Sequence, residues 1–178
     1  MTNPDRLSGL DSAFLHLERG GAHMHVASIM VFSGKTPSYD QFLRFLQSRL
    51  DSVPRYRQRL AFVPLEQGRP VWVDDPHFNV RYHLRHSALP SPGEDAQLAA
   101  LAGRLFAERL DRDKPLWEMN LVEGLAPGAD GEARFAVIVK THHALVDGVS
   151  GVDITSVLFS ASPGEELIPE APEWIPRP

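Results

Sequence analysis

The stretch ARFAVIVKTHHALVDG, residues 133–148, joins a strand-like run to a polar turn. In an extended chain, its apolar residues alternate between Phe135, Val137 and Val139 on one face and Ala136 and Ile138 on the other. A strand that is apolar on both faces is typical of a sheet interior. The stretch therefore predicts a central strand covered on both sides, and α/β folds commonly place their chemistry where such strands end.

The segments around this strand alternate between helical and extended patterns. Ser38 and Gln41 have the spacing of a capping box, and apolar residues then recur at helical period. We expect helices within residues 10–18, 37–54, 91–115 and 148–160, and strands within residues 23–34, 56–64, 70–75, 80–89, 116–125 and 133–143. In the first helix, Asp11 is the expected N-cap, and Phe14, Leu15 and Leu17 are expected to point inward. The fold class predicted is α/β, an α+β two-layer sandwich with helices packed against a mixed central sheet.

Composition narrows the class of protein. The chain has 178 residues, of which 43% are hydrophobic and 23% charged, so it can bury the core of one domain. A net charge of −5 gives no sign of the basic surface that nucleic-acid binding needs. Disulfides and thiolate metal sites are excluded, because no cysteine is present. The start lacks the apolar core of a signal peptide, and no run approaches the roughly 18 apolar residues of a spanning helix, so we expect a cytoplasmic protein.

Two adjacent histidines end the predicted central strand. Because side chains alternate along a strand, His142 and His143 should point in opposite directions, and only one of them should reach a given reacting atom. Asp147 and Gly148 follow in the bend toward the next helix. Asp147 can accept backbone N–H groups or pair with an arginine, and Gly148 can adopt backbone angles that other residues resist. Such a bend would hold one imidazole in place.

Three interpretations of these histidines stay open on residue patterns alone. As a general base, a neutral imidazole takes a proton from an alcohol or amine as it attacks an acyl carbon. As a metal site, His143 and Asp147 would need further ligands, for which His23 and His25 share a strand face. As structural groups, the histidines would be hydrogen-bonded side chains at a strand end. A covalent serine mechanism is disfavoured, because GVSGV around Ser150 lacks the final glycine of a nucleophile elbow.

The motif HHALVDG, residues 142–148, resembles the HHxxxDG signature of a superfamily of CoA-dependent acyltransferases. That superfamily includes chloramphenicol acetyltransferase and the condensation domains of nonribosomal peptide synthetases. Three further stretches, LSGLDSAFLHLE, MHVASIMVF and DRDKPLWEMNLVEGL, are similar to the bacterial wax ester synthase/diacylglycerol acyltransferase family. The resemblance runs from about Leu7 to the end of the chain.

The resemblance implies one half of a chloramphenicol-acetyltransferase-like fold and an O-acyltransferase. It implies transfer of a fatty acyl group from acyl-CoA, as a co-substrate, to diacylglycerol or a long-chain alcohol, with no bound cofactor and no metal. His143 would be the catalytic base, His142 a supporting residue, and Asp147 the partner of an arginine that holds the loop. Gly148 would leave room at the site, and attack would be direct, without an acyl-enzyme.

The resemblance also implies a structural role for Pro115, Leu116 and Trp117, which lie in the third of these stretches. Trp117 would be a buried anchor or, in the alternative, would line a substrate channel. Family members are considerably longer, which implies that residues 1–160 form an N-terminal domain and that proline-rich residues 161–178 lead toward a missing C-terminal half. That half would supply much of the acyl and CoA pocket, so the isolated chain would lack part of the site and expose an apolar docking face.

Two alternatives to a lipid-forming acyltransferase stay open. The acceptor could be another alcohol, such as a polyketide or a cell-wall lipid, attacked with the same histidine chemistry. The chain could instead be a non-catalytic half-domain that binds lipid or acts as a scaffold. Any contact with the inner membrane or with lipid bodies would be peripheral in each case.

Overall fold

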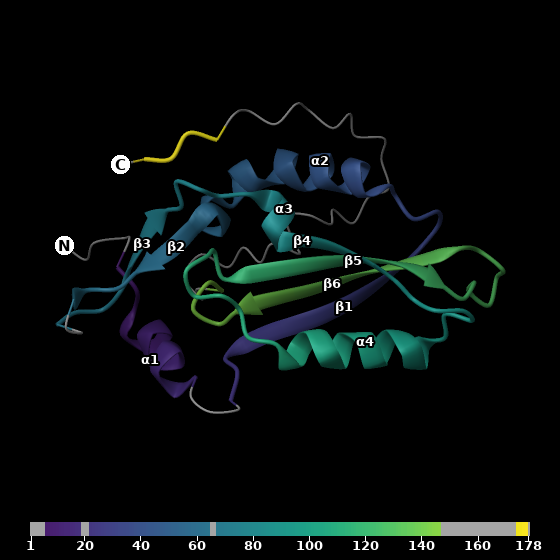
Figure 1. The fold of residues 1–178 in the computed structure, drawn as a ribbon, viewed down its shortest axis with the longest axis horizontal. Helices are drawn as coiled ribbons and strands as arrows, with labels where there is room; N and C mark the ends of the chain where they lie inside the picture. Colours follow the sequence, from purple (N-terminus) through teal and green to yellow (C-terminus); the bar gives the residue numbers. More distant parts are fainter. Residues whose placement is uncertain (1–5, 19–21, 65–66, 147–173, 178) are drawn as a thin grey trace.

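The structure is a computed structural model that describes residues 6–18, 22–64, 67–146 and 174–177 (Figure 1). Its elements follow the chain in this order: α1 (Gly9–Leu17), β1 (His25–Ser33), α2 (Tyr39–Arg49), η1 (Leu50–Ser52), η2 (Pro54–Arg57), β2 (Gln58–Ala61), β3 (Val71–Asp74), α3 (Val80–His83), β4 (Leu84–Ala88), α4 (Asp95–Ala107), β5 (Trp117–Leu125) and β6 (Arg134–His142).

A four-stranded mixed sheet in the order β1-β6-β5-β4 forms the centre of the fold. Strand β6 is antiparallel to both of its neighbours, whereas β4 runs parallel to β5. The register pairs His142 of β6 with His25 of β1, and Thr141 of β6 with Trp117 of β5. Strands β2 and β3 form a separate antiparallel pair. The predicted central strand is therefore confirmed as β6.

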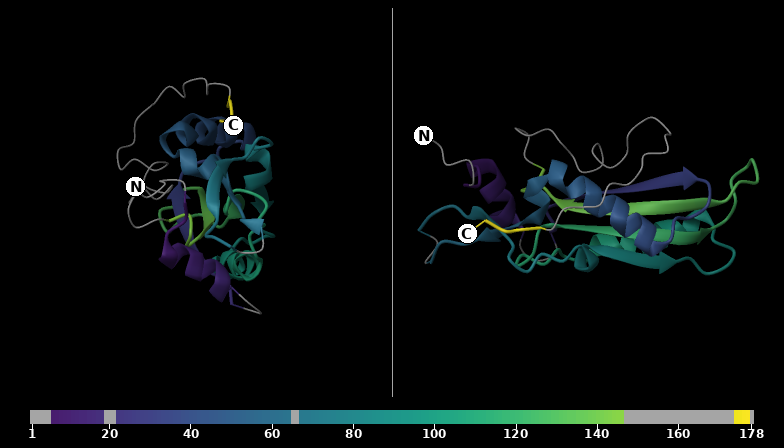
Figure 2. Two further views of the ribbon diagram at one scale, coloured as in Figure 1. Left: turned by 90° about the vertical axis from the view of Figure 1, so that its left-hand side faces the viewer. Right: turned by 90° about the horizontal axis from the view of Figure 1, so that it is seen from above.

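Helices cover both faces of the four-stranded sheet, as Figure 1 and Figure 2 show from different sides. Helix α2 belongs to the buried core that contains Val137 and Val139. Helix α4 belongs to the core on the other face, with Ala136 and Ile138. The predicted α/β class with a mixed central sheet and packed helices is confirmed. Because β6 is apolar on both faces, helices pack against each side of the sheet. The fold therefore has three layers, whereas the predicted sandwich has two.

The carboxyl end of β6 lies at the end of the sheet where α1 and the β2–β3 pair gather (Figure 1). The turn that follows β6 is fixed there, because its amides find acceptors. His143 donates to the Met24 carbonyl at 2.9 Å, and the Leu145 amide donates to the His142 carbonyl at 2.9 Å. Ala144 and Leu145 are buried in the same core as α2. His142 ends β6 at this turn, and His143 is the first residue of the turn.

The helix starts show which local predictions were right. The capping box of α2 is confirmed: the Ser38 hydroxyl accepts from the Gln41 amide at 3.3 Å, and the Gln41 side chain accepts from the Ser38 amide at 2.8 Å. The N-cap predicted for α1 was wrong. Ser8 caps that helix and accepts from the amide of Asp11 at 3.1 Å, which places Asp11 inside the first turn. Leu15 is buried as predicted, whereas the prediction for Leu17 was wrong, because it is 60% exposed at the end of α1.

The segment 80–89 is only partly extended. Its first residues form the short helix α3, since the Asn79 side chain accepts from the Arg81 amide at 3.0 Å and starts a helical turn. The strand β4 begins only at Leu84. The prediction of a strand from residue 80 was therefore wrong at its start, because a local side-chain cap overrode the β propensity of the sequence.

Some predictions lie outside the described residues. These are the helix expected at 148–160 and most of the proline-rich segment 161–178. Within that segment, Arg177 donates to the Asp74 carboxylate from its amide and its guanidinium at 2.8–3.1 Å. The boundary at residue 160 stays a prediction. None of the helices in the described part of the chain has the length and apolar content needed to cross a bilayer.

Candidate active site

His142, the last residue of β6, is a buried histidine that is 1% exposed. Its Nδ1 accepts a hydrogen bond from the Ala144 amide at 3.0 Å, so the proton of the neutral ring is on Nε2. Nε2 lies 3.8 Å from Glu18 Oε2 and has no hydrogen-bond partner among the described atoms. Burial lowers the pKa of His142 to about 4, against the opposing charge of Glu18. This ring is therefore neutral near pH 7.

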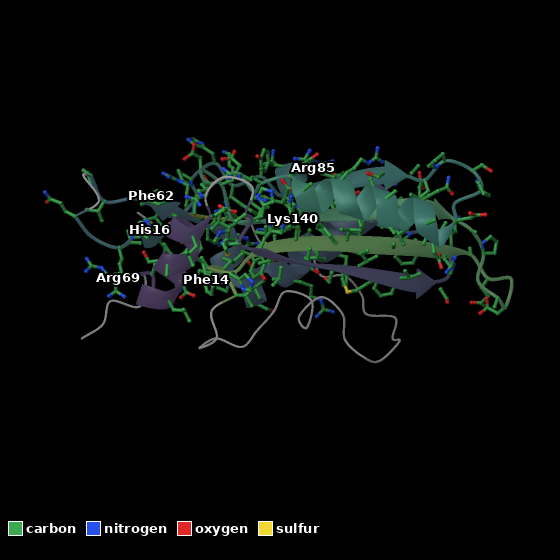
Figure 3. All side chains as sticks on the ribbon, turned by 90° about the horizontal axis from the view of Figure 1, so that it is seen from below. Phe14, His16, Phe62, Arg69, Arg85 and Lys140 are labelled. Carbon is green, nitrogen blue, oxygen red and sulfur yellow. The ribbon has the colours of Figure 1, made fainter. Side chains whose placement is uncertain are left out.

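His143 differs from its neighbour because it is only half-buried. Its ring stacks on Phe14 of α1, with centroids 5.0 Å apart and planes inclined by 25°. Its backbone is held by the hydrogen bond to Met24, in the connection that precedes β1. The imidazole is thus oriented on one side by an aromatic ring and retains access to solvent. Figure 3 labels Phe14 beside His16 on the same short helix.

Glu18, the C-cap residue of α1, joins these groups. Its side chain is 4% exposed and accepts from the Met24 amide at 3.3 Å. The guanidinium of Arg112 donates to Glu18 Oε2 from Nε at 3.1 Å and from Nη2 at 2.6 Å, and to the Leu15 carbonyl at 2.8 Å. Burial alone would raise the pKa of Glu18, but the hydrogen bonds from Arg112 and Met24, with nearby positive charge, lower it. The carboxylate therefore stays ionised beside His142.

Two further histidines lie on the β1 side of this cluster. His25 Nε2 forms a hydrogen bond with the Phe106 carbonyl at 2.9 Å, and its ring stacks on His23 at 5.4 Å. Burial, with the nearby charge of Lys140, lowers the pKa of His25. The hydrogen bond to Phe106 engages only Nε2 of His25, and Nδ1 is buried without a hydrogen-bond partner among the described atoms. Among the described residues, no group of three histidine or carboxylate side chains is placed to hold a metal ion.

The motif Pro115, Leu116 and Trp117 lies directly behind the histidines. The His142 amide donates to the Leu116 carbonyl at 3.0 Å. Trp117 is fully buried, its indole N–H donates to the Tyr56 carbonyl at 2.8 Å, and it stacks on His83 at 4.6 Å. The interpretation of Trp117 as a buried anchor agrees with this position.

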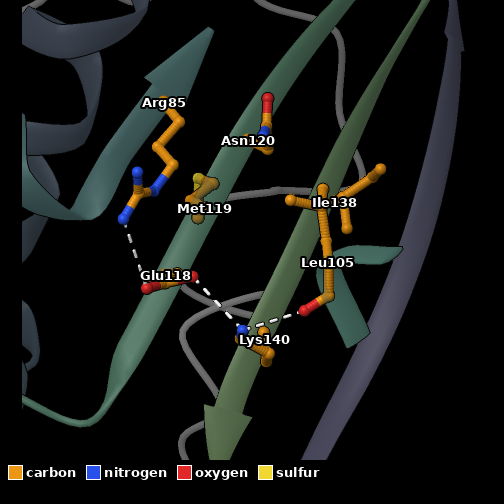
Figure 4. A pocket seen from close by; sticks show the side chains of 7 residues that line it. All are labelled: Arg85, Leu105, Glu118, Met119, Asn120, Ile138 and Lys140. Atoms are coloured by element: carbon orange, nitrogen blue, oxygen red, sulfur yellow. Dashed lines mark hydrogen bonds and ion pairs between the residues drawn. The ribbon is translucent and has the colours of Figure 1, made fainter. Parts of the chain in front are cut away.

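A small pocket beside the site lies on the α4 face of the sheet (Figure 4). Its buried Lys140 donates to the carbonyls of Leu105 and Glu108 at 3.0 and 2.9 Å, and pairs with Glu118 at 3.3 Å. Arg85 reaches the other oxygen of Glu118 at 3.6 Å. Lys140 therefore attaches the end of α4 to the sheet.

The structure brings together some of the predicted site residues and adds others. His142, His143 and the Pro115–Trp117 motif meet at the end of β6, whereas Asp147 and Gly148 lie outside the described residues. Sequence analysis missed Glu18 and Arg112. Both belong to stretches that carry the family resemblance, but their pairing across 94 positions leaves no periodic signal.

The sequence matches the family described as wax ester synthase/diacylglycerol acyltransferase catalytic domain over residues 7–178. This chain belongs to that family. It is 41% identical to the probable diacylglycerol O-acyltransferase tgs3 of Mycobacterium tuberculosis over 174 residues, which cover 97% of the chain and 62% of tgs3. The catalytic domain of the family thus includes the histidine turn, α1 and the loop that carries Arg112.

Solved structures agree with this family assignment. The wax ester synthase/diacylglycerol acyltransferase from Marinobacter aquaeolei VT8 has a TM-score of 0.70 and 33% identity, over 93% of this chain and 41% of that one. The starter condensation domain of rhizomide synthetase has a TM-score of 0.61 over 78% of this chain and 31% of its own. At 14% identity, that likeness shows the fold alone. The chain spans 62% of the length of tgs3 and 41% of the Marinobacter enzyme.

Proposed function

We propose that this chain carries the general-base half of an O-acyltransferase that moves a fatty acyl group from acyl-CoA to diacylglycerol or a long-chain alcohol. The main support is one contrast within a catalytic domain of this family. Of two adjacent histidines, His142 is buried with its Nδ1 engaged, whereas His143 is half-buried at the end of the central strand. A ring that retains access to solvent can meet a substrate hydroxyl, and a sealed ring cannot.

In the proposed reaction, the acceptor hydroxyl donates a hydrogen bond to the unprotonated ring nitrogen of His143. That nitrogen takes the proton as the hydroxyl oxygen bonds to the thioester carbonyl carbon, a transfer typically worth roughly 10²–10⁴-fold in rate. The tetrahedral intermediate then collapses, the carbon–sulfur bond breaks, and the proton passes from His143 to the CoA thiolate. The products are the ester and free CoA, and no acyl-enzyme forms.

His142 is proposed to support this chemistry rather than to perform it. Its Nδ1 accepts from Ala144, and its Nε2 is buried 3.8 Å from Glu18 Oε2, so neither nitrogen is available to a substrate. Asp147 and Gly148 are proposed to complete the bend, with Asp147 paired to an arginine.

The pocket for the acyl chain and CoA is proposed to be completed by a C-terminal half, because the chain spans only part of the relatives that it matches. Apolar side chains on the described surface support such a docking face. Strand β1 exposes Val26, Ile29 and Val31 at 42%, 40% and 46%, and α1 exposes Leu10 and Leu17 at 68% and 60%. Some of these side chains are also available for peripheral contact with a lipid surface.

The test is neutral-lipid synthesis from labelled palmitoyl-CoA with hexadecanol or diolein as acceptor. The full-length protein, or this chain combined with a separately expressed C-terminal segment, is compared with His143→Ala and with the exposed matched control His77→Ala. We expect His143→Ala to lose roughly 10²–10⁴-fold in rate and His77→Ala to match the wild type.

Other outcomes would overturn the proposal. Undiminished activity of His143→Ala would exclude the general-base role. Product formed only with polyketide-like or cell-wall alcohols would change the acceptor. Lipid binding without turnover in every combination would favour a scaffold.

A further inference from the structure

We propose that the Glu18–Arg112 ion pair positions His143, because Glu18 contacts the residues that fix the backbone of the histidine turn. The effect on catalysis rests on the proposed function, whereas the positioning itself is a property of the folded chain. Glu18 and Arg112 are thus positioning residues, and neither is proposed to touch a substrate.

The first connection runs through Met24. Glu18 Oε1 accepts from the Met24 amide at 3.3 Å, and the Met24 carbonyl accepts from the His143 amide at 2.9 Å. One peptide-linked residue therefore separates the Glu18 carboxylate from the backbone of the proposed base. Any shift of the carboxylate moves the acceptor of the His143 amide.

The second connection runs through His142. Its Nδ1 accepts from Ala144, the residue after His143, so the ring proton is on Nε2, which lies 3.8 Å from Glu18 Oε2. A buried N–H without a hydrogen-bond partner is unfavourable, and the nearby carboxylate offers the compensating charge. The charged and titratable groups near His142 are Glu18, Arg112, His143 and His25. Of these, Glu18 carries the negative charge that attracts the Nε2–H.

Arg112 holds the carboxylate in this place. Its fork donates to Glu18 twice and to the Leu15 carbonyl once, which also attaches the last turn of α1. Without that guanidinium, a buried carboxylate would be uncompensated or would take up a proton. The same helix carries Phe14, four residues before Glu18, whose ring stacks on His143. The ion pair therefore fixes both the backbone and the aromatic support of the proposed base.

The structural part is tested by NMR on this chain, without substrate. In Glu18→Gln, which removes the charge but keeps the shape, we expect at least roughly tenfold faster hydrogen exchange of the His143 amide, because its opening becomes easier. We also expect shifted ring signals of His142 and His143. The Trp117 indole N–H, which is bonded to the Tyr56 carbonyl and not to the Glu18–Arg112 pair, should keep its signal. Asp113→Asn, an exposed carboxylate next to Arg112, is the matched control and should change none of these signals.

The catalytic part uses the acyl-transfer assay on the same variants. We expect kcat of Glu18→Gln to fall roughly 10- to 100-fold, as small misplacements of a catalytic group do, with KM for acyl-CoA nearly unchanged. If the wild type transfers no acyl group, the proposed function fails and the NMR result alone decides the positioning. Wild-type exchange and ring signals in Glu18→Gln would overturn the inference. If Glu18→Gln does not fold, Arg112→Lys takes its place, because lysine keeps the charge but cannot donate two parallel hydrogen bonds to Glu18. We expect the same changes in exchange and ring signals at smaller size. Their absence in Arg112→Lys would equally overturn the inference.

Discussion

Replacing Trp117 by phenylalanine tests whether this residue is an anchor of the core or the wall of a substrate channel. Trp117 is 0% exposed and donates its indole N–H to the buried Tyr56 carbonyl at 2.8 Å. Losing that bond costs about 1–3 kcal/mol. The void left by the smaller ring adds about 1 kcal/mol at ~24 cal/mol per Å³. The expected loss is therefore about 3 kcal/mol, or a Tm lower by about 6–12 °C in a chain of this size.

The measurement is thermal and urea unfolding of this chain, with Trp72→Phe as the matched control. Trp72 is buried at 6% exposure, but its indole donates no hydrogen bond within the described residues. Its loss should be about 1 kcal/mol from the void, because phenylalanine keeps a ring face for the Arg55 guanidinium, 5.2 Å from the Trp72 ring. Equal losses in the two variants would refute the reasoning. Unchanged stability of Trp117→Phe together with an altered preference for acyl chain length would favour the channel interpretation.

Two further predictions concern buried ionisable side chains. Burial lowers the pKa of His83 and that of His142 from the ordinary 6.5 to about 4. Between about pH 4 and pH 6.5, the unfolded chain therefore binds more protons than the folded chain. Stability should therefore be lost as pH falls from about 6.5 to about 4, by up to about 1.4 kcal/mol per pH unit for each histidine. Urea unfolding of the wild type should show this dependence of the unfolding free energy on pH, and His83→Asn should show a shallower one. An unfolding free energy that does not change between these pH values would contradict the prediction. Lys140→Met should cost about 3 kcal/mol in the same assay, because it breaks a buried ion pair and two bonds to α4. Glu118→Gln, as the milder control, should cost less, and an unchanged midpoint for Lys140→Met would contradict the assigned role.

The parts of the fold that sequence analysis predicted are those with a local or periodic cause. The apolar alternation of residues 135–139 predicted a strand covered on both faces, and burial confirms it. Ser38 and Gln41 predicted the start of α2, since a capping box needs only side chains three positions apart. The start of α1 was misplaced because Ser8 and Asp11 both satisfy the compositional rule for an N-cap, and only backbone geometry distinguishes them.

The candidate site was predicted less completely, for a physical reason. His142 and His143 stand next to each other in the chain, and strand alternation indicates that they have different surroundings. Glu18 and Arg112 lie 94 positions apart in the chain and meet only in the folded structure. Long-range ion pairs of this kind have no period or composition of their own. His143 is therefore proposed as the base from the motif, whereas Glu18 and Arg112 come near it only in the folded structure.

The loop after α4 and the first residue of β5 make two attachments only a few residues apart. Arg112 reaches α1, and Trp117 reaches η2 through Tyr56 and α3 through His83, whose Nδ1 bonds the Trp117 carbonyl at 2.8 Å. The number of residues between Arg112 and Trp117 is consequently more strictly constrained than the identity of most side chains in that segment. An insertion or deletion between these two residues would detach one end of the loop, even with every side chain retained.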